Sequence, residues 1–254
     1  MSDLNGQTVV VIGGSSGIGF AVATQSLRSH ASLVIIASSS AQKVDNAVNG
    51  IQAFIQQSGL IAYVTGKVLN MKDSNQIRAF FSEIGQLDHL VITSGDPPIL
   101  GPFKTLDLDQ ARGSFDTRFW GAAVAAQSAQ IKKGGSIVLT VGTVIKKPEP
   151  GWALVTGQAG ATDSLTRGLS VDLVKRSMLR YSTLAPIRVN IIAPGYVSLW
   201  DTVPQDAREK MLQEAADKLL VKHVVSADEM LVLCIRCGFI TGETLHVNGG
   251  QTLI

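Results

Sequence analysis

The sequence predicts an α/β fold in which a doubly wound, seven-stranded parallel sheet carries helices on both faces. Apolar runs alternate with segments of helical periodicity along the chain, which is the pattern of repeated β–α units. Runs such as LVIIA are continuously apolar, as expected for parallel strands buried on both faces. A glycine-rich segment joins the first apolar run to the first helical segment. The length of 254 residues fits one domain that covers residues 1–254.

Seven strands and seven helices are expected in alternation. Each expected strand is a short run rich in apolar and β-branched residues: Thr8–Ile12, Leu33–Ala37, Ile61–Thr65, His89–Thr93, Ser136–Val141, Arg188–Ile192 and Thr244–Val247. The expected helices lie between and after these runs, at Gly17–Ser29, Gln42–Gln57, Ser74–Ile84, Leu108–Ile131, Trp152–Met178, Gln205–Leu219 and Ala227–Cys237. Ligands of such a fold bind outside the carboxyl ends of the strands, so the loops that follow the strands are the candidate binding loops.

Composition and charge argue against several classes of protein. Hydrophobic residues make up 45% of the chain and charged residues 17%, which is enough apolar content for a large core. The net charge is only +2 and no long basic run is present, so no nucleic-acid partner is expected. No apolar run reaches the roughly 18 residues of a membrane span, and the chain enters a strand without a signal-like segment. We therefore expect a cytoplasmic protein with no membrane partner.

The cysteines and histidines do not indicate a metal site. Cys234 and Cys237 form one C-x-x-C pair, which cannot close a four-ligand zinc site. A redox pair is expected near the start of a helix, whereas this pair comes late in an apolar helical stretch. We therefore interpret both cysteines as small buried side chains. The four histidines share no motif: His30, His89, His223 and His246.

The segment VVVIGGSSGIGFAVA predicts a dinucleotide-binding loop and hence a Rossmann-type sheet. Its glycines follow a strand and open a helix, where the backbone must turn sharply and come close to a pyrophosphate. The helix start then offers free N–H groups and a partial positive charge to the phosphates. The expected phosphate-binding residues are Gly13, Ser15, Ser16, Gly17, Ile18 and Gly19.

The end of the second expected strand favours NADP(H) over NAD(H). An acidic residue at this place binds the ribose hydroxyls of NAD and repels a 2′-phosphate. Here the sequence has Ser38, Ser39 and Ser40, with Lys43 just beyond and no carboxylate. The alternative is a serine-rich turn that caps the next helix. Both can hold, with Ser40 as the cap and the other two serines at the phosphate.

Four segments together resemble the short-chain dehydrogenase/reductase family. They are the G-x-x-x-G-x-G spacing, LDHLVITSG, IRVNIIAPGYV and ITGETLHVNGG, and they span nearly the whole chain in the family's order. The resemblance implies an NADP(H)-dependent oxidoreductase that is a homodimer or homotetramer through its long small-residue helices. It also implies that the backbone of Val197 holds the nicotinamide carboxamide. Further cofactor contacts are then expected at Met71, Ser94, Gly95, Pro194 and Gly195.

The residues that most members of this family use for proton transfer are missing. Those members reduce a carbonyl with an Asn, a Ser and a Tyr-x-x-x-Lys pair on one helix, and such acid–base help is typically worth roughly 10²–10⁴ in rate. By resemblance to the segment DSLTRGLSVDL, the Tyr and Lys positions are Val155 and Ala159. The Ser position falls on Gly142 or Thr143, and the Asn position on Arg118.

A substrate that already carries positive charge removes the need for that proton. Hydride addition to C=O leaves an alkoxide, whereas addition to an iminium leaves a neutral amine. A carboxylate roughly 4 Å from the cation contributes about 4 kcal/mol at an effective dielectric of 20. Glu149 is the candidate, because Pro148 and Pro150 hold its loop rigid. Gly151 lets the backbone pass close to cofactor or substrate, and Trp152 can cover the substrate.

The string P-E-P-G-W resembles the P-D-P-G-W motif of an atypical branch of the family. That branch includes the fungal reductase/Diels–Alderases of malbrancheamide and paraherquamide biosynthesis, which lack the Tyr and Lys and bind NADP(H). The resemblance implies reduction of an iminium, imine or activated double bond in a bulky natural-product-like substrate, with templating of an intramolecular [4+2] closure. It places the functional pair at Glu149 and Arg118. Glu in place of Asp, and about ten extra residues between Leu173 and Leu184, depart from the branch.

Other interpretations remain open from the sequence. The protein can be a carbonyl reductase whose proton comes from Glu149 or water, or an NADP(H)-binding scaffold without activity. Glu149 can be a solvated loop residue, and Arg118 a surface cation paired with some acid. Trp152 can be a core residue at a helix start, and Trp120 is interpreted as a packing residue.

Overall fold

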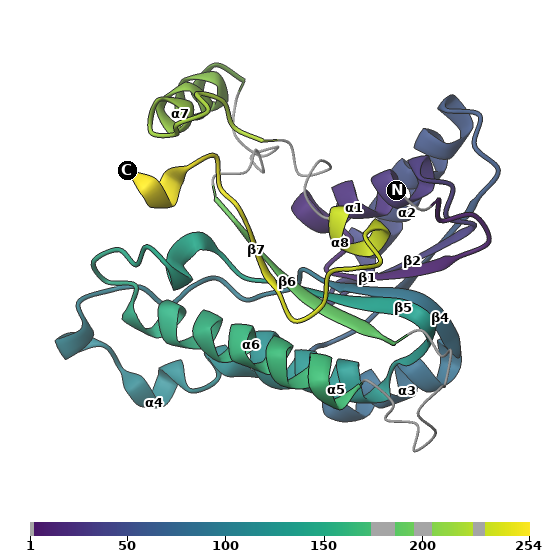
Figure 1. Ribbon diagram of the computed structural model, residues 1–254, viewed down its shortest axis with the longest axis horizontal. Helices are drawn as coiled ribbons and strands as arrows, with labels where there is room; N and C mark the ends of the chain where they lie inside the picture. The colour runs from purple at the N-terminus through teal and green to yellow at the C-terminus, as the bar shows by residue number, and fades with distance from the viewer. Residues whose placement is uncertain (1–2, 174–185, 196–204, 226–231) are drawn as a thin grey trace.

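The computed structural model describes residues 3–173, 186–195, 205–225 and 232–254. Its strands form one parallel sheet in the order β3-β2-β1-β4-β5-β6-β7, which confirms the predicted fold class (Figure 1). The strands are β1 Thr8–Ile12, β2 Leu33–Ser38, β3 Tyr63–Val68, β4 Gln86–Ile92, β5 Gln130–Thr140, β6 Arg188–Pro194 and β7 Thr244–Val247. The order reverses between β1 and β4, and this reversal defines the place where such sheets bind ligands.

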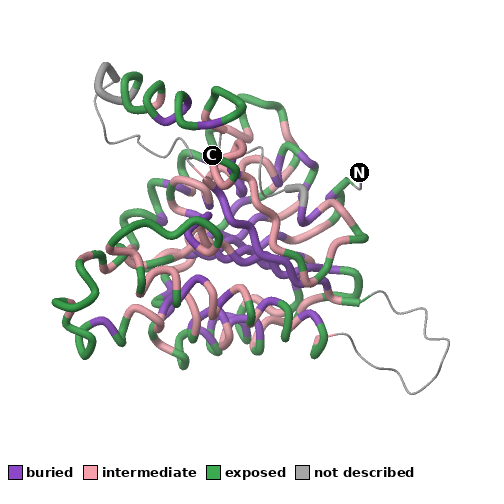
Figure 2. The backbone as a smooth tube through the Cα atoms, turned by 60° about the vertical axis from the view of Figure 1, so that its left-hand side comes forward, coloured by how far each residue is buried: buried purple, intermediate pink, exposed green. Residues whose placement is uncertain are grey.

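The helices cover both faces of the sheet, with α1, α2 and α8 on one side and α3, α5 and α6 on the other (Figure 1). Their bounds are α1 Gly17–Arg28, α2 Ala41–Gln57, α3 Ser74–Ile84, α4 Leu108–Ala111, α5 Ala122–Ser128, α6 Ala153–Asp172, α7 Gln205–Asp217 and α8 Val232–Arg236. Two apolar cores result, one on each face, and Figure 2 shows the buried strands between more exposed helices. No helix in the described ranges combines the length and apolarity that crossing a membrane requires.

The single helix expected over Leu108–Ile131 is wrong. The structure has the short α4, then a π-helical turn η2 at Asp116–Gly121, then α5, and β5 begins at Gln130. A register shift in the β4–β5 pairing lets β5 extend toward its amino end. Gly135 permits this extension, because a Cβ there would lie 2.1 Å from the Asp88 carbonyl oxygen. Short-range periodicity could not show this pairing with a distant strand.

Other differences concern element ends. The third strand starts two residues later than expected and runs to Val68, and α7 ends at Asp217. The helix expected at Trp152–Met178 corresponds to α6 in the described residues. The helix expected at Ala227–Cys237 corresponds to α8. The remainder of these two predictions, and the extra segment after Leu173, lie outside the described residues.

The buried Arg188 explains the environment of the cysteine pair. Its guanidinium donates hydrogen bonds to the carbonyl oxygens of Cys234 and Cys237 at 2.7 and 2.8 Å and to that of Ile235 at 2.8 Å. Both cysteines are free thiols; Cys234 is buried and Cys237 half-buried. Burial raises the pKa of the Cys234 thiol to about 12. The prediction of a small buried side chain is confirmed for Cys234, whose thiol stays protonated.

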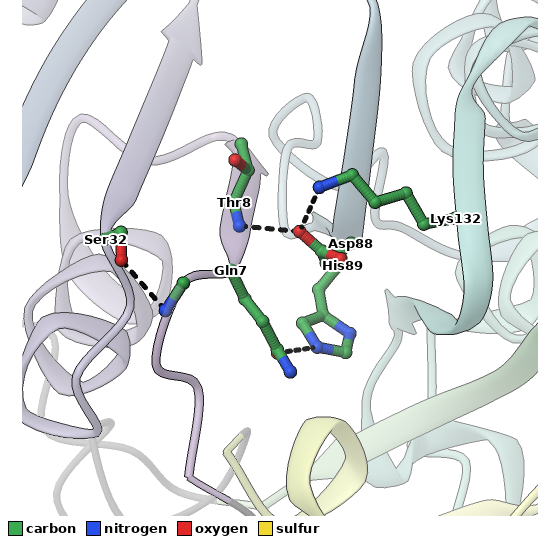
Figure 3. A network of polar contacts seen from close by, with 7 residues as sticks. Gln7, Thr8, Ser32, Asp88, His89 and Lys132 are labelled. Atoms are coloured by element: carbon green, nitrogen blue, oxygen red, sulfur yellow. Dashed lines mark hydrogen bonds and ion pairs between the residues drawn. The ribbon is translucent and has the colours of Figure 1, made fainter.

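A polar network fixes the amino ends of the central strands, at the edge opposite to the ligand-binding loops (Figure 3). His89 is buried, with Nδ1 2.8 Å from the Ser136 hydroxyl and Nε2 2.7 Å from Gln7 Oε1. Beside it, the Asp88 carboxylate accepts a bond of 3.0 Å from Lys132 Nζ. Burial, followed by the charge of Arg188, lowers the pKa of His89 to about 4.

This network predicts that the fold loses stability in weak acid. The unfolded chain binds a proton at His89 near pH 6.5 and the folded chain only near pH 4, so stability falls as the pH drops through this window. The loss approaches about 3 kcal/mol at pH 4. Urea denaturation at pH 7 and pH 4.5 measures it, and His89→Gln should flatten the difference. The exposed His223→Gln variant is the control and should keep the pH dependence of the parent. If His89→Gln also keeps it, the assignment to His89 fails.

Candidate active site

Loops at the carboxyl ends of β1 to β5 line a cleft of about 430 Å³ at the reversal of the strand order. Most of the residues expected at the dinucleotide lie along it: Gly13, Ser15, Ser16, Gly17, Ile18, Gly19, Ser38, Ser39, Lys43, Met71, Ser94 and Gly95. We refer to it as the cofactor cleft. Segments far apart in the sequence therefore meet where a doubly wound sheet binds its ligand.

Two glycines make the phosphate loop possible. Gly13 has φ +90°, and a Cβ on it would lie 2.6 Å from the backbone nitrogen of Ser94. A Cβ on Gly19 would lie 2.2 Å from the Gly13 carbonyl oxygen. Ser16, the N-cap residue of α1, makes no side-chain capping bond. The N–H groups at the helix start thus remain available for a phosphate.

The floor of the cofactor cleft carries hydroxyl groups that lack partners. Ser94 Oγ and Thr140 Oγ1 are both buried, and neither has a hydrogen-bond partner among the described residues. Both residues line the cleft. Buried hydroxyls are normally satisfied, so these two fit a polar ligand such as a ribose or carboxamide. The cleft therefore fits a dinucleotide by shape and by chemistry.

The end of β2 divides its serines between two roles. The Ser15 and Ser38 hydroxyls are 2.9 Å apart, and Ser39 and Lys43 line the cofactor cleft with them. Ser40 instead caps α2, accepting a bond of 3.4 Å from the backbone nitrogen of Lys43. Ser40 does not line the cleft, so the structure shows the helix-capping role for it and not the predicted cofactor contact.

A second cavity of about 470 Å³ adjoins the cofactor cleft, and we call it the substrate cavity. The two share three lining residues: Asp96, Arg118 and Val141. Pro194 and Gly195, expected at the cofactor, line the substrate cavity and not the cofactor cleft. Val197 lies outside the described residues. A ligand in the cofactor cleft can thus meet a substrate at the shared boundary.

The residues that the family resemblance assigns to the four usual catalytic positions all line this cavity, and Arg118, at the Asn position, lies on its boundary with the cofactor cleft. Val155 and Ala159 of α6 line it, as do Gly142 and Thr143 after β5. No tyrosine is present among the lining residues in the described part of the chain. Among these described lining residues, no phenol is placed to protonate the alkoxide that hydride addition to a carbonyl would leave.

Glu149 and Trp152 both line the substrate cavity, Glu149 from an exposed loop and Trp152 half-buried at the start of α6. The backbone nitrogen of Trp152 donates to the Glu149 carbonyl oxygen at 3.1 Å. Gly151 has φ +83°, and its carbonyl oxygen accepts a bond of 3.1 Å from the Gly101 nitrogen. The close approach that the structure shows at Gly151 is to Gly101 in the loop after β4, and Gly151 is not among the residues that line the substrate cavity.

Arg118 belongs to the π-helical turn η2, a kind of irregularity that is frequent at functional sites. Its guanidinium lies against Gly95, where a Cβ would be 2.0 Å from Cζ. Burial lowers the pKa of Arg118, and the nearby Asp96 carboxylate acts in the opposite direction. No ion pair within the described ranges joins Arg118 to Glu149, so the expected pairing of these two is not formed. Its neighbouring acid is Asp96.

The sequence interpretation missed the residues around Asp96. Its Oδ2 accepts a bond of 2.8 Å from the Thr117 hydroxyl and lies 3.1 Å from Lys72 Nζ. The position after Ser94-Gly95 at a strand end was a signal that could have identified it. Trp120 was interpreted as a packing residue, but 59% of it is exposed, and its ring packs edge-to-face on Phe119.

Comparison with known proteins identifies the family to which this chain belongs. A family model for an SDR-like Rossmann domain matches residues 1–253. The short-chain dehydrogenase/reductase fsr5 of Gibberella fujikuroi is 32% identical over 275 residues, covering 100% of this chain and 97% of the relative. The structure of MalC reductase/Diels–Alderase from Malbranchea aurantiaca superposes with a TM-score of 0.84 at 27% identity, over 99% of this chain and 98% of that chain.

A small-chain dehydrogenase solved in complex with NADPH is also similar, with a TM-score of 0.72 and 27% identity over 98% of this chain and 99% of that chain. The fold, the glycine-rich cleft and the family match lead to one conclusion. The chain belongs to the short-chain dehydrogenase/reductase family of oxidoreductases. At the two positions where the family resemblance predicts the Tyr and Lys of the Tyr-x-x-x-Lys arrangement, this sequence has Val155 and Ala159.

The contact between Gly95 and Arg118 can be tested directly. Gly95→Ala should displace the guanidinium, which is the end of a flexible side chain, and leave the fold intact. Affinity for NADPH should then fall about tenfold, the size of a lost charge-assisted bond. Adding Arg118→Ala should cost little more, because the two changes affect one interaction. Gly157→Ala is the control, since a Cβ there meets no atom within 4 Å. Additive losses in calorimetric titrations would refute the contact.

Proposed function

We propose that this protein is an NADPH-dependent reductase of an iminium, imine or similarly activated double bond in a bulky, largely apolar substrate. The observation that carries the proposal is that the side chains around the substrate cavity differ from those of the usual family site. Apolar Val155 and Ala159 replace the phenol and ammonium of the usual site, and a carboxylate, Glu149, stands on the cavity wall. Such a site suits a hydride acceptor that is already cationic.

The charges of the cofactor cleft favour a phosphate-rich cofactor. Lys43, Lys72 and Arg118 line it, against the single acidic residue Asp96 in its described lining. At the end of β2 there are hydroxyls and no carboxylate to repel a 2′-phosphate. The relative solved with NADPH supports the same choice. We therefore assign NADP(H) to the cleft.

When bound, NADPH supplies a hydride, so that an iminium and NADPH become an amine and NADP⁺ with no proton transferred. Glu149 then stabilises the substrate cation before the transfer. It is free to do so, because no ion pair joins it to a cation in the described part of the chain. The neighbouring Lys147 is instead held by backbone oxygens of Gln251, at 3.1 Å, and Ile254. Trp152 offers its ring face to the cation or to an aromatic part of the substrate.

We further propose that the substrate cavity orders the product for an intramolecular [4+2] closure. The similar MalC protein is described as a reductase/Diels–Alderase. Apolar and proline side chains form much of this cavity's wall: Pro97, Pro98, Ile99, Val144, Trp152, Leu154 and Val155. A closure of this type needs positioning more than acid–base groups, and positioning alone can supply a large part of a barrier.

We also propose that the protein assembles as a homodimer or homotetramer. In the family that this chain resembles, the helices that correspond to α5 and α6 pair between subunits, which supports the proposal. Two large apolar residues on or beside these helices are exposed in the single chain, Trp120 by 59% and Val171 by 61%. Burying them against a second copy removes apolar surface from water.

The role of Glu149 predicts a selective loss of turnover. Glu149→Gln should lower kcat for a cyclic iminium by about tenfold to a hundredfold, because the carboxylate's charge is lost while the side-chain shape is kept. NADPH affinity should not change. Glu149→Asp, the residue of the related motif, should retain more activity than Glu149→Gln. Steady-state kinetics with calorimetric NADPH titrations check this; wild-type turnover by the Gln variant would refute the role.

The cofactor choice predicts a second outcome. Ser39→Asp places a carboxylate at the end of β2 and should weaken NADPH binding about tenfold or more, with NADH binding unchanged or improved. The control is Ser74→Asp, the same substitution at an exposed position at the start of α3. Fluorescence titration of both reduced cofactors gives the ratio. An unchanged ratio in Ser39→Asp would contradict the assigned place of the 2′-phosphate.

A further inference from the structure

Asp96 holds a central place among the charges of the two cavities. It follows Ser94 and Gly95 after β4, and within the described residues it is the only acidic residue that lines both the cofactor cleft and the substrate cavity. Its Oδ2 accepts the Thr117 hydroxyl bond at 2.8 Å and lies 3.1 Å from Lys72 Nζ. The carboxylate thus links the loop after β3 to the turn that carries Arg118.

The chain holds Asp96 in place from both sides. Pro97 and Pro98 follow it, and a residue before proline is restricted to extended conformations. Gly95 precedes it and accommodates the Arg118 guanidinium directly against its Cα. The negative charge therefore has a fixed position beside two cations, those of Lys72 and Arg118. One carboxylate against two cations leaves this junction with a net charge of +1.

The junction is where the reactive end of the cofactor must lie. The phosphate loop and the serines after β2 occupy the other part of the cleft. A hydride can pass to a substrate only where the cleft meets the substrate cavity, at Asp96, Arg118 and Val141. The dihydronicotinamide ring is neutral and the oxidised ring is cationic, so the charge of the junction favours one form over the other.

We propose that Asp96 sets the relative affinity of the protein for oxidised and reduced cofactor, by offsetting the positive charge of Lys72 and Arg118 at the junction. This inference rests on the proposed binding of NADP(H). With Asp96 ionised, the oxidised ring meets a net charge of +1 and is tolerated. Without it, the same ring meets two uncompensated cations. Asp96 therefore favours hydride transfer from NADPH, because it stabilises the NADP⁺ that the transfer leaves. Loss of the Asp96 charge makes the protein bind NADPH in preference to NADP⁺.

The test compares two dissociation constants in the same protein. Asp96→Asn keeps the shape and an acceptor for the Thr117 hydroxyl, and removes the charge. We expect the ratio of the NADP⁺ to the NADPH dissociation constant to rise about tenfold, measured by isothermal titration calorimetry. Lys72→Gln removes a positive charge and should lower the ratio, by roughly threefold because this side chain is half exposed. A purely structural role would weaken both cofactors alike and leave the ratio unchanged.

The matched control is Asp109→Asn, the same chemical change at a side chain that is 89% exposed on α4, outside the lining of both cavities. It should leave the ratio at the parent value. Opposite shifts in Asp96→Asn and Lys72→Gln support the proposal, and an unchanged ratio in both overturns it. If Asp96→Asn does not fold, the direction of the Lys72→Gln shift decides alone. Failure of the parent to bind either cofactor would instead overturn the proposed cofactor, a result visible before any variant is made.

Discussion

The loop after β1 packs directly on the end of β4, and the position of the cofactor cleft depends on this contact. Gly13 lies so close to Ser94, and Gly19 so close to Gly13, that a Cβ at either glycine would overlap backbone atoms. The Thr93 hydroxyl donates to the carbonyl oxygen of Gly13 at 3.3 Å. Because the loop is held there, the start of α1 faces the end of β4.

The positive charge near the cofactor has a different origin from that of the usual family site. Ala159 on α6 stands where the family resemblance predicts the lysine, whereas Arg118 reaches the same cavity from η2. The two elements are in contact, since the Thr162 hydroxyl donates to the Arg118 carbonyl oxygen at 3.4 Å. In the described lining a cation is thus present, while Val155 stands where the resemblance predicts the phenol. With this combination of residues, a cation is available to bind a cofactor, but no phenol beside it among the described residues is available to donate a proton.

The fold could be predicted from local sequence patterns, whereas the contacts between side chains at the site depend on residues that are far apart in the sequence. The buried strands and the phosphate loop were predictable, because apolar runs and glycine spacing act over a few residues. The partner of Arg118 was not, because the π-helical turn and the close packing on Gly95 depend on how η2 meets β4. Glu149 could be placed at the cavity from its proline-flanked loop, but its separation from Arg118 required coordinates.

The exposure of Glu149 determines how strongly it can act. In water, two unit charges 4 Å apart interact by only about 1 kcal/mol, and by about 4 kcal/mol at an effective dielectric of 20. An exposed carboxylate gains the larger value only when the substrate itself excludes water from the cavity wall. A bulky apolar substrate beside Trp152 would do this, whereas a small iminium would leave water around the carboxylate. Under the proposed function, substrate size and the effect of the Glu149 charge are therefore linked, and the cavity of about 470 Å³ is consistent with the larger kind of substrate.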